Sequence, residues 1–506
     1  MNYADLFRVT LPETALEIAA LIVLVVDLGF LRKAHVKTRV AAASLLGVLG
    51  CVAALATLFF QPYGGLATAN GETLLSVGGY STVGQIGVLG LTILTLCLFF
   101  DSEFTRHAGE YVAVVLMAAA GGLLISSAQD LLVIFVGLEL LSLGLYILAA
   151  FAKQSGKSAE GAMKYYLYGG MSAAFLLFGF SYLYGLAGST NLHRIMVAMY
   201  GPNVLNASPL LYVALVMIAA GLGFKVAAVP FHMWAPDAYE GSPAPSAAFI
   251  ASVSKVASFA LLIGIGTAAA HAFLPNEQIF LDTSGRPPKY LGFQGPWSVI
   301  VVLLAVASMV LGNLAALAQV SVRRLLAYSA IAHAGYMLLG LAYFSHSPMS
   351  ANAIQYYILT YGITTIAAFG AVGIVERAAG SDRLDAFLGL SQRNPVLASE
   401  LLVLFLSLAG IPPLVGFWAK FNLFAAVLRT GTGVVPLALV ALAVAMSAVS
   451  LYYYLQVLKR VYVMPAVDKT PIRASQITMI TLQLITAAVV VLGCFPELLQ
   501  RWIAGF

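Results

Sequence analysis

The sequence predicts an all-α polytopic membrane protein with about 14 transmembrane helices. Of its 506 residues, 61% are hydrophobic and only 9% are charged, whereas a soluble domain usually carries about 25% charged residues. The mean hydropathy is +0.93. Apolar stretches of roughly 20 residues, the length that crosses a bilayer, recur along the whole chain. These stretches must be helical, because the bilayer core holds no water to satisfy an open backbone.

The apolar stretches give the expected order of the helices. We expect spans at residues 11–31, 40–60, 82–100, 110–127, 129–151, 163–187, 208–230, 244–272, 297–318, 322–344, 352–376, 396–428, 432–458 and 475–495. The start of the chain contains Asp5 and Glu13 instead of basic residues, and Arg32 and Lys33 follow the first stretch without a small-residue cleavage site. We therefore expect the first stretch to be a retained span and not a signal peptide.

Lysine and arginine are distributed unevenly over alternate loops. One set of loops and adjoining helix ends holds seventeen of them, including Arg32, Lys33 and the group at 153–164, and the other set holds six. Because cytoplasmic loops are enriched in Lys and Arg, the first set is expected in the cytoplasm. Both termini are then expected outside.

Composition also limits the chemistry that this chain can perform. The formal net charge is +5, but the basic residues are scattered through loops and form no patch that would bind nucleic acid. Cys51, Cys97 and Cys494 lie far apart, with no CxxC motif and no neighbouring histidines. We therefore expect no metal site, no bound cofactor and no redox chemistry in this chain.

Three lysines belong to neither set of loops. Lys225, Lys255 and Lys420 each lie deep inside an apolar stretch. A lysine near a helix end can extend its side chain to the membrane surface, but these three are separated from the nearer loop by many apolar residues. Since ionisable residues inside a span usually line an ion or proton path, we interpret these lysines as functional.

Glu139 is the one carboxylate near the middle of an expected span, and it therefore needs an internal partner. At about 4 Å and an effective dielectric constant near 20, an opposite charge stabilises it by about 4 kcal/mol. That energy is enough to switch the protonation of a neighbouring lysine. Other carboxylates near apolar stretches lie toward span ends, where interfacial or helix-end positions are expected: Glu13, Glu17, Asp27, Asp130 and Glu400.

Two polar pairs recur at nearly constant spacing, which indicates an internal duplication. Glu139 and His333 each follow a Leu-Leu pair at the same distance and are 194 residues apart. Gly221-x-x-x-Lys225 recurs as Gly416-x-x-x-Lys420, 195 residues later. We expect duplicated units at about 110–272 and 297–458, preceded by three helices in 1–109 and followed by a last helix in 475–506. Since each unit has five spans, the second is inverted relative to the first.

Prolines are expected to interrupt the helix that carries the lysine in each unit. Pro230 follows Lys225, and Pro412 and Pro413 precede Lys420. Proline removes a backbone hydrogen bond and frees carbonyl groups that can line a wet cavity. The duplication is imperfect, because the prolines do not superpose under the offset and Lys255 corresponds to Ser450.

Four runs of sequence carry a resemblance to a known family. They are FKVAAVPFHMWAPDAYEGSPAP, SVSKVA, GNLAALAQVSVRRLLAYSAIAHAGYMLLG and LAGIPPLVGFWAKF. They resemble the membrane subunits of bacterial NADH-quinone oxidoreductase (respiratory complex I) that belong to the Mrp antiporter-like family. The run from Asp237 through Glu240 to Pro243, Lys255, and the run from Ala332 to Tyr336 are similar to the subunit N group in particular. The resemblance covers nearly the whole chain.

The resemblance implies a fold and a proton relay. The fold would have fourteen helices, with two inverted five-helix bundles and broken helices 7 and 12. Glu139 would pair with Lys225 on the broken seventh helix, and Lys255 would be the relay on the eighth. His333 would then bridge toward Lys420 on the broken twelfth helix. The implied function is proton pumping by a translocase subunit, coupled to electron transfer from NADH to quinone in other subunits.

The resemblance also implies partners and a location. The partners would be the other membrane and peripheral subunits of complex I, the lipid bilayer, protons and water. FMN, iron-sulfur clusters and quinone would be held by partner subunits. The chain would cross the bacterial plasma (inner) membrane many times, with both termini on the periplasmic side.

Two alternatives stay open from the residues alone. A cation/proton antiporter subunit of an Mrp-type complex would use buried lysines and broken helices equally well. A purely structural membrane subunit is the weaker alternative, because small residues pack helices at less expense than buried lysines. The roles of His232, Asp237 and Glu240, at a helix end or at a mouth where protons are taken up, are not decided by the sequence.

Overall fold

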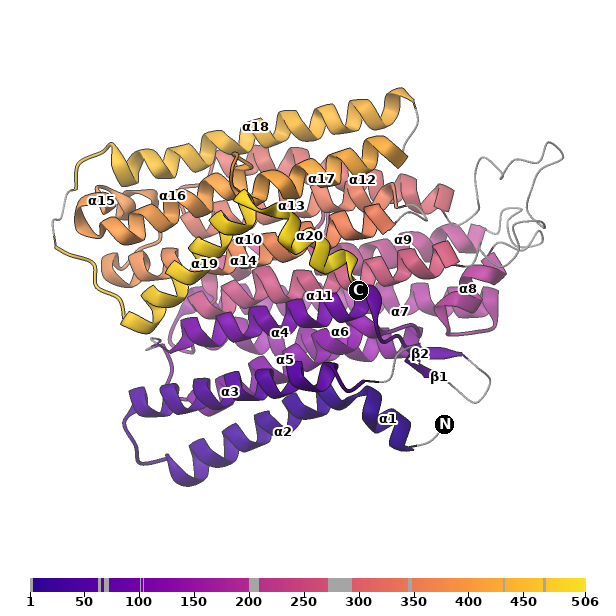
Figure 1. Ribbon diagram of the computed structural model, residues 1–506, viewed down its shortest axis with the longest axis horizontal. Coiled ribbons are helices and arrows are strands. Elements are labelled where there is room, and N and C mark those ends of the chain that lie inside the picture. The colour runs from indigo at the N-terminus through magenta and orange to yellow at the C-terminus, as the bar shows by residue number, and fades with distance from the viewer. Residues whose placement is uncertain are drawn as a thin grey trace.

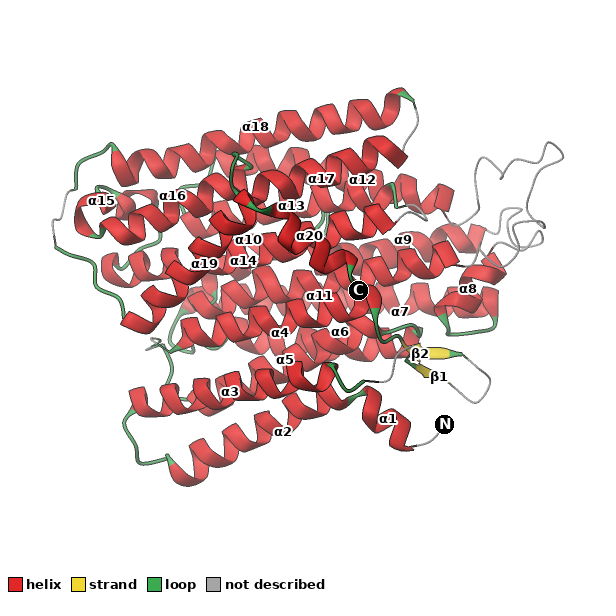
Figure 2. Ribbon diagram, viewed as in Figure 1, coloured by secondary structure: helices red, strands yellow, loops and turns green. Residues whose placement is uncertain are grey.

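Helices make up nearly all of the regular structure in the described part of the chain (Figure 2). The computed structural model describes residues 3–61, 65–67, 72–100, 102, 104–199, 209–271, 294–344, 348–430, 433–466 and 470–506. In these residues the β structure, apart from isolated bridges, is one antiparallel pair of short strands, β1 (Leu66–Ala67) and β2 (Thr73–Leu75). The all-α fold class predicted from composition is confirmed.

The chain is built from an N-terminal group of helices, two longer successive groups and a C-terminal pair. The N-terminal group is α1 (Tyr3–Val9), α2 (Leu11–Val25) with a π-helical turn at Val26–Phe30, α3 (Val36–Leu58) and α4 (Gly79–Phe99). The next group is α5 (Ala108–Ser127), α6 (Leu131–Ala149), α7 (Gly156–Ala187), α8 (Leu192–Met199), α9 (Pro209–Val226), α10 (Trp234–Gly241) and α11 (Ala244–His271).

The second half of the chain follows the same pattern of long and interrupted helices. It contains α12 (Gln294–Leu317), α13 (Val322–Ala342), α14 (Pro348–Ala379), a 3₁₀ turn (Leu384–Phe387), α15 (Leu390–Arg393), α16 (Pro395–Ala409), α17 (Val415–Thr430) and α18 (Val434–Tyr462). The C-terminal pair is α19 (Gln476–Cys494) and α20 (Pro496–Ala504).

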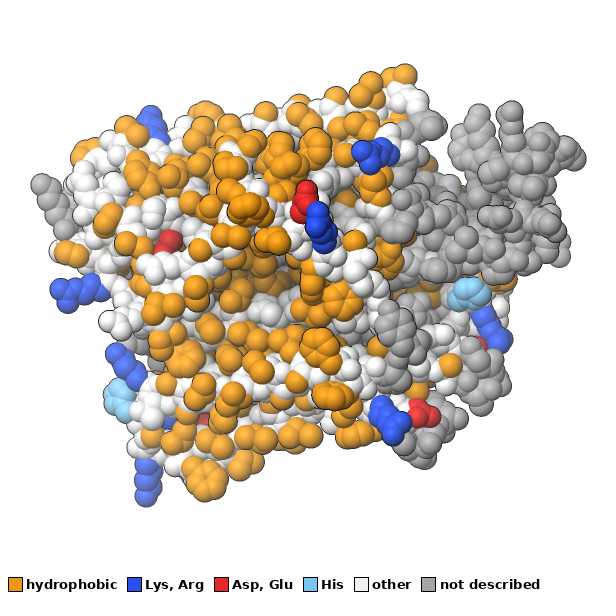
Figure 3. Space-filling model, in the orientation of Figure 1, with side chains coloured by type: hydrophobic (Ala, Val, Ile, Leu, Met, Phe, Trp, Pro, Cys, Tyr) orange, Lys and Arg blue, Asp and Glu red, His pale blue; other side chains and the backbone are white. Residues whose placement is uncertain are grey.

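The long helices run roughly alongside one another as one elongated bundle (Figure 1). The indigo helices α2 and α3 form one side of the bundle in this view, α18 forms the opposite side, and α19 and α20 cross the visible face. Apolar side chains cover most of that face, while Lys and Arg side chains gather mainly toward its ends (Figure 3). An apolar middle with basic residues toward its ends is the surface expected of a protein that crosses a bilayer.

Twelve of the described helices are long and apolar enough to cross a membrane. Two of the fourteen expected spans are absent from these twelve because each is interrupted. In the first, α2 passes into the π-helical turn before the helix ends at Phe30. In the other, α16 and α17 are separated by residues 410–414. The chain is a multi-pass membrane protein.

Both expected helix breaks are present. Helix α9 ends at Val226, directly after Lys225, and Val229-Pro230 follows in the irregular segment before α10. The freed backbone groups find side-chain partners: the Phe224 carbonyl accepts a hydrogen bond from Trp234 Nε1 at 3.0 Å, and the Val229 N–H donates to Ser308 Oγ at 2.9 Å. Such partners allow an open backbone at membrane depth.

The second break ends α16 at Ala409. Gly410 follows at φ +89°, a backbone conformation that glycine adopts without steric penalty. The Pro412-Pro413 bond lies in the same segment, and α17 starts at Val415. Lys420 is therefore carried by the helix after the break, whereas Lys225 lies before its own.

The same backbone corner occurs at the start of α6 and at the start of α13. At α6, Leu131 N–H donates to Thr190 O and Leu192 N–H donates to Gln129 O, both at 2.9 Å. At α13, the matching bonds are Val322 N–H to Asp382 O and Leu384 N–H to Val320 O, again at 2.9 Å. The first residue of each helix is preceded by a side-chain N-cap, Asp130 or Ser321.

Two glycines allow α12 and α13 to approach closely on both sides of His333. A Cβ added at Gly312 would lie 2.7 Å from the Ala332 backbone nitrogen, and one added at Gly335 would lie 2.7 Å from the Met309 nitrogen. Small residues at such contacts are typical of membrane helix packing. The close contact of α12 with α13 therefore depends on the absence of side chains at both positions.

We expect Gly312→Ala to destabilise the protein by about 1–3 kcal/mol, because the new methyl group would meet the backbone and force α12 away from α13. Gly170→Ala is the matched control, since a Cβ there meets nothing within 4 Å. The measurement is the thermal unfolding midpoint of the purified protein in detergent. Equal midpoints for the two variants would contradict this account of the helix contact.

Candidate functional site

Five sequence-predicted residues define the candidate site, and four of them are buried. Lys225, Lys255, His333 and Lys420 are each at most 6% exposed. The fifth, Glu139, is only half-buried. Each of the four buried groups has a polar partner from another helix or from a helix break.

Lys225 contacts α6 through a hydroxyl group and not through the predicted carboxylate. Its ammonium group donates to Ser142 Oγ, and the Ser142 hydroxyl in turn donates to the Leu138 carbonyl. Glu139 lies one turn before Ser142 and acts on Lys225 only through its charge, since no ion pair within 4 Å joins them. The expected close Glu139–Lys225 ion pair is not formed in this structure, and the two charges interact only at a distance greater than 4 Å.

Glu139 is turned partly toward the outside of the bundle. Leu132, Val136 and Leu143, which precede and follow it at helical spacing, are each more than half exposed. The carboxylate therefore lies beside an outward apolar stripe of α6. In a bilayer this stripe would contact lipid or another membrane protein.

Lys255 reaches from α11, in the first of the two long groups of helices, to α13 in the second. Its Nζ donates to the Ala330 carbonyl at 2.5 Å and lies 5.6 Å from the centre of the Tyr361 ring. A carbonyl dipole and the face of an aromatic ring both stabilise an ammonium group that has lost its water. The Tyr361 ring lies 5.0 Å from the His333 ring, so one tyrosine links Lys255 to His333.

His333 lies among three tyrosines. Its Nδ1 is 2.8 Å from the Tyr357 hydroxyl, and its ring centre is 5.8 Å from that of Tyr336. The charges of both Lys255 and Lys420 act on it, and its ring interacts with the Leu408 carbonyl. His333 is therefore placed between the two lysines, as its expected bridging role requires.

Lys420 is held by the broken end of α16. Its Nζ donates to the carbonyls of Leu408 at 3.1 Å and Ala409 at 2.8 Å, and to Ser447 Oγ at 2.8 Å. The last carbonyls of a helix carry partial negative charge and favour a cation. Tyr336 lies under the same ammonium group, 5.4 Å from ring centre to Nζ. The Leu408 carbonyl and the Tyr336 ring thus connect Lys420 with His333.

A small cavity of about 10 Å³ lies beside His333, which is room for about one water molecule. It is lined by residues of α13, α14, α16 and α17: His333, Tyr357, Thr360, Tyr361, Thr364, Ser407, Leu408, Gly416 and Ala419. A water there could exchange protons with both His333 and the groups around Lys420. The described contacts contain no comparable link between Lys225 and Lys255.

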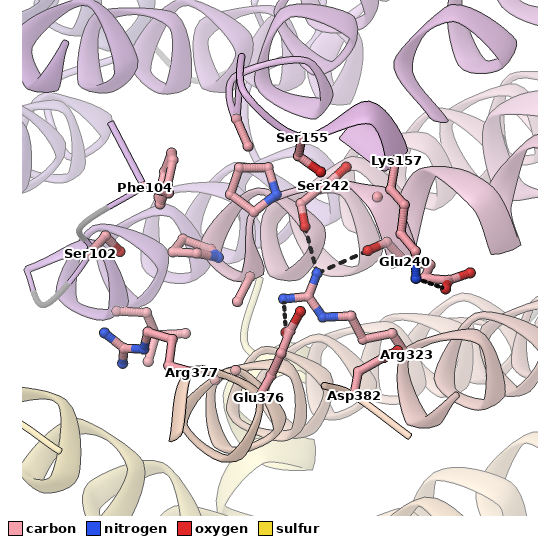
Figure 4. Close-up of a pocket in the computed structure, with 18 of the residues that line it drawn as sticks. Ser102, Phe104, Ser155, Lys157, Glu240, Ser242, Arg323, Glu376, Arg377 and Asp382 are labelled. Atoms are coloured by element: carbon pink, nitrogen blue, oxygen red, sulfur yellow. Dashed lines mark hydrogen bonds and ion pairs between the residues drawn. The ribbon is translucent and has the colours of Figure 1, made fainter. Parts of the chain in front are cut away.

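A larger cavity of about 570 Å³ opens at the end of the bundle where α5 and α13 begin. Figure 4 shows the Arg323 side chain inside it. Arg323 donates to the Ser242 carbonyl at 2.6 Å and pairs with Glu376 at 2.5 Å, and Lys157 pairs with Glu240 at 2.9 Å (Figure 4). The Arg323 Nε is buried without a partner among the described residues. The cavity therefore combines open space with alternating charges.

Asp237 and Glu240 belong to an ion-pair network at this cavity. Asp237 pairs with Lys164 at 2.7 Å and with Arg324 at 2.5 Å, and Glu240 pairs with Arg324 at 3.1 Å as well as with Lys157. Burial alone would raise the pKa of each carboxyl, but the ion pairs outweigh it and hold both pKa values below their usual range. Both residues are therefore ionised at neutral pH.

His232 lies between α9 and α10 and is not part of this network. Its Nδ1 is buried without a partner among the described residues, and burial lowers the pKa of its ring. His232 is therefore neutral near pH 7. A neutral imidazole can accept a proton, so this state is compatible with a helix-end histidine and with a proton acceptor alike.

Several polar residues of the site were not recognised from the sequence. Tyr357 and Tyr361 are four residues apart, with threonines nearby on the same apolar helix, and this spacing could have indicated a polar side of α14. Glu400, expected at an interface or helix end, lies in the second turn of α16, and its burial, with 2% of it exposed, was not expected. Ser142 gave no signal, because a single serine in an apolar helix is common.

No group of three or more His, Cys, Asp and Glu side chains that could hold a metal ion occurs in the described ranges. Cys51, Cys97 and Cys494 are free cysteines. The groups of the candidate site itself are amines, an imidazole, hydroxyls and backbone carbonyls, which can exchange protons with water.

Comparison with known proteins places this arrangement in one family. A family model described as "NADH:quinone oxidoreductase/Mrp antiporter, TM" matches residues 128–281 and 286–447. The chain is 47% identical to NADH-quinone oxidoreductase subunit N 2 of Acidobacterium capsulatum, with 99% of both chains covered. It is 37% identical to NADH-quinone oxidoreductase subunit N of Desulfovibrio desulfuricans, covering 97% of this chain and 95% of that one.

Solved structures agree with these relatives. A chain of respiratory complex I from Thermus thermophilus matches with a TM-score of 0.76 and 32% identity, covering 97% of this chain and 98% of that one. A chain of the Mrp complex from Dietzia sp. matches with a TM-score of 0.78, covering 97% of this chain and 51% of that one, but at 22% identity it shows only that the fold is shared.

We expect Arg324→Gln to destabilise the protein by about 1 kcal/mol at pH 7, because Asp237 and Glu240 lose a shared partner. The lowered carboxyl pKa values give stability that is fully present above about pH 4 and is lost as pH falls through those values. The difference from the unsubstituted chain should therefore shrink below about pH 4. Unfolding midpoints from pH 7 downward check this, with the exposed Arg32→Gln as control; a difference that does not change with pH would contradict it.

Proposed function

The chain belongs to the NADH:quinone oxidoreductase/Mrp antiporter transmembrane family, and from this premise we propose that it is the proton-translocating membrane-arm subunit of an NADH-quinone oxidoreductase. The observation that carries the proposal is the series Lys255, Tyr361, His333, Tyr336 and Lys420, in which each member contacts the next. The buried amines and the imidazole are separated by these tyrosine rings, so water would have to carry protons between them, whereas a structural role would require no such series.

Protons would move along this series with water as the carrier. The cavity beside His333 has room for about one water, and the Leu408 carbonyl receives hydrogen bonds from the Lys420 end. Moving one charge against 100 mV of membrane potential requires about 2.3 kcal/mol. A change of one charge–charge contact supplies energy of this size.

Glu139 is suited to receive the signal from a partner subunit. It lies on the outward side of α6, and its charge acts on Lys225 across a distance greater than 4 Å. At an effective dielectric constant near 20, the attraction at such distances is below about 4 kcal/mol and grows as the groups approach. A partner that shifts α6 or changes the charge beside Glu139 would therefore change the proton affinity of Lys225.

The cavity around Arg323 would be the mouth for proton uptake from the cytoplasm. It opens at the end of the bundle that carries Lys157 and Lys164, the end that the distribution of Lys and Arg assigns to the cytoplasm. With this orientation both termini lie on the periplasmic side of the plasma membrane. Carboxylates at such a mouth raise the local proton concentration.

The redox groups would be held by partner subunits. Electron transfer from NADH to quinone needs FMN, iron-sulfur clusters and a quinone site, and the described residues offer no cluster of metal ligands. This chain would contribute only the proton path. Its partners would be the other membrane and peripheral subunits of the complex, lipid and water.

The two groups of five spans at 110–272 and 297–458 would be duplicated, inverted units, flanked by 1–109 and 475–506. The matching backbone corners at the starts of α6 and α13 support this division. So does the presence of one lysine-bearing broken helix in each group. The inversion would give each unit its own half of the path, opening toward opposite sides of the membrane.

We expect Lys225→Met and Lys420→Met to lower the number of protons pumped per NADH oxidised, because methionine keeps the bulk of the side chain but cannot carry a proton. The measurement is proton uptake into sealed vesicles alongside NADH oxidation by the assembled complex. Lys153→Met, an exposed loop lysine, is the matched control. An unchanged ratio in both variants of fully assembled complex would refute the proposed function.

We expect Glu139→Gln to reduce the coupling of pumping to electron transfer by several-fold, whereas Glu139→Asp keeps most of it, because only the aspartate retains a negative charge on α6. The pumping ratio in vesicles again gives the measurement. Glu17→Gln, which removes an exposed carboxylate of α2, serves as the control. If the Gln and Asp variants behave alike, the charge of Glu139 has no role in coupling.

A further inference from the structure

Glu400 is a buried carboxyl group that the proton path described above does not use. It lies in the second turn of α16 and is 2% exposed. Both of its carboxylate oxygens are buried without a hydrogen-bond partner among the described residues. An unpartnered carboxyl in this position is unusual, because buried polar groups are nearly always hydrogen-bonded.

The surroundings of Glu400 require a neutral carboxylic acid. No ion pair joins it to a described cation, and an ionised carboxylate without partners is strongly unfavourable in a low-dielectric interior. The helix N-terminus at Pro395 is more than one turn away, beyond the range in which the helix dipole acts. Glu400 therefore holds a proton in this conformation.

Helix α16 carries both Glu400 and, nine residues later, a carbonyl that binds Lys420. The helix begins at Pro395 and ends at Ala409. The Ala409 carbonyl accepts a hydrogen bond from the Lys420 ammonium group at 2.8 Å. Ser407 is seven residues, or two turns, after Glu400 and lies on the same side of the helix. Ser407 also lines the one-water cavity beside His333.

A role in packing alone does not explain this side chain. A carboxylic acid without a hydrogen-bond partner stabilises the interior less than leucine or methionine would, and its polar atoms lose water on burial. Neighbouring positions of α16 are indeed leucine, at Leu401 and Leu404. A proton-exchange step, by contrast, requires a carboxyl group that can gain and lose its proton and is not held by a permanent hydrogen bond.

We propose that Glu400 is a proton-holding residue that exchanges its proton with Lys420 through water along this side of α16. In the forward step the carboxyl O–H bond breaks and an N–H bond forms on neutral Lys420. A neutral acid and a neutral amine thus become a carboxylate and an ammonium, and the net charge of this half of the protein does not change. The inference rests on the proposed function and adds a residue to its path.

The test uses the assembled complex with Glu400→Gln, Glu400→Asp and the exposed control Glu17→Gln. We expect Glu400→Gln to lower the protons pumped per NADH to the ratio of Lys420→Met, and Glu400→Asp to restore much of the loss. An unchanged ratio in Glu400→Gln overturns the proposal. If Lys225→Met and Lys420→Met also pump normally, the proposed function fails as a whole; if they do not, only the role of Glu400 fails.

A second measurement does not depend on how well the variants assemble. A hydrophobic carbodiimide adds to a protonated carboxyl: the acid proton passes to nitrogen, the carboxyl oxygen bonds to carbon, and rearrangement leaves a stable N-acylurea. We expect mass spectrometry of the unsubstituted complex to find this adduct on Glu400, with loss of pumping, and to find none on the exposed Glu497. Absence of the adduct on Glu400 overturns the proposal.

Discussion

An ammonium group can remain inside a bilayer only if protein groups replace the water that it has lost, and this constraint explains much of the architecture. Removing a charge from water costs several kcal/mol even after the protein relaxes. Lys420 recovers part of this energy from two carbonyls and a hydroxyl, and Lys255 from one carbonyl and one aromatic ring. Charge-assisted hydrogen bonds contribute about 1.5–3 kcal/mol each, and a desolvated cation–π contact about 2 kcal/mol. The energy that these contacts supply is therefore similar in size to the cost of removing the charge from water. Each lysine can consequently exist in either protonation state.

The helix breaks supply these carbonyls. A continuous helix would use the carbonyls of Leu408 and Ala409 internally, and Lys420 would have no partner at this depth. Gly410 and the two prolines end α16 early and leave both groups available. Two tyrosine rings also replace water around the ammonium groups. Tyr361 and Tyr336 each contact a lysine and, in addition, His333. The same contacts that solvate the charges thus connect them.

The sequence was sufficient to predict the class, the number of spans, the two breaks and the buried lysines, because each depends on residue type and spacing along one helix. It was insufficient for contacts that depend on the rotation of a helix about its own axis. In a soluble protein, polar residues mark the outward side of a helix, but these spans are apolar all round. Glu139, expected to face inward, is turned partly outward, and the burial of Glu400 near the start of α16 was not expected. The partners of Lys225 and Lys255 could not be predicted for the same reason.

The absence of a described contact between Lys225 and Lys255 is what a proton pump would require. The described contacts connect Lys255 through His333 to Lys420, but none connects Lys225 to Lys255. A path that was connected at all times would let protons return down the membrane potential, at about 2.3 kcal/mol released per charge per 100 mV. Conduction therefore has to be interrupted at some point and restored only when the complex turns over. Under the proposed function Lys225 would be the appropriate place, since it is held by one serine hydroxyl and lies within the influence of Glu139, a half-buried carboxylate beside the outward stripe of α6.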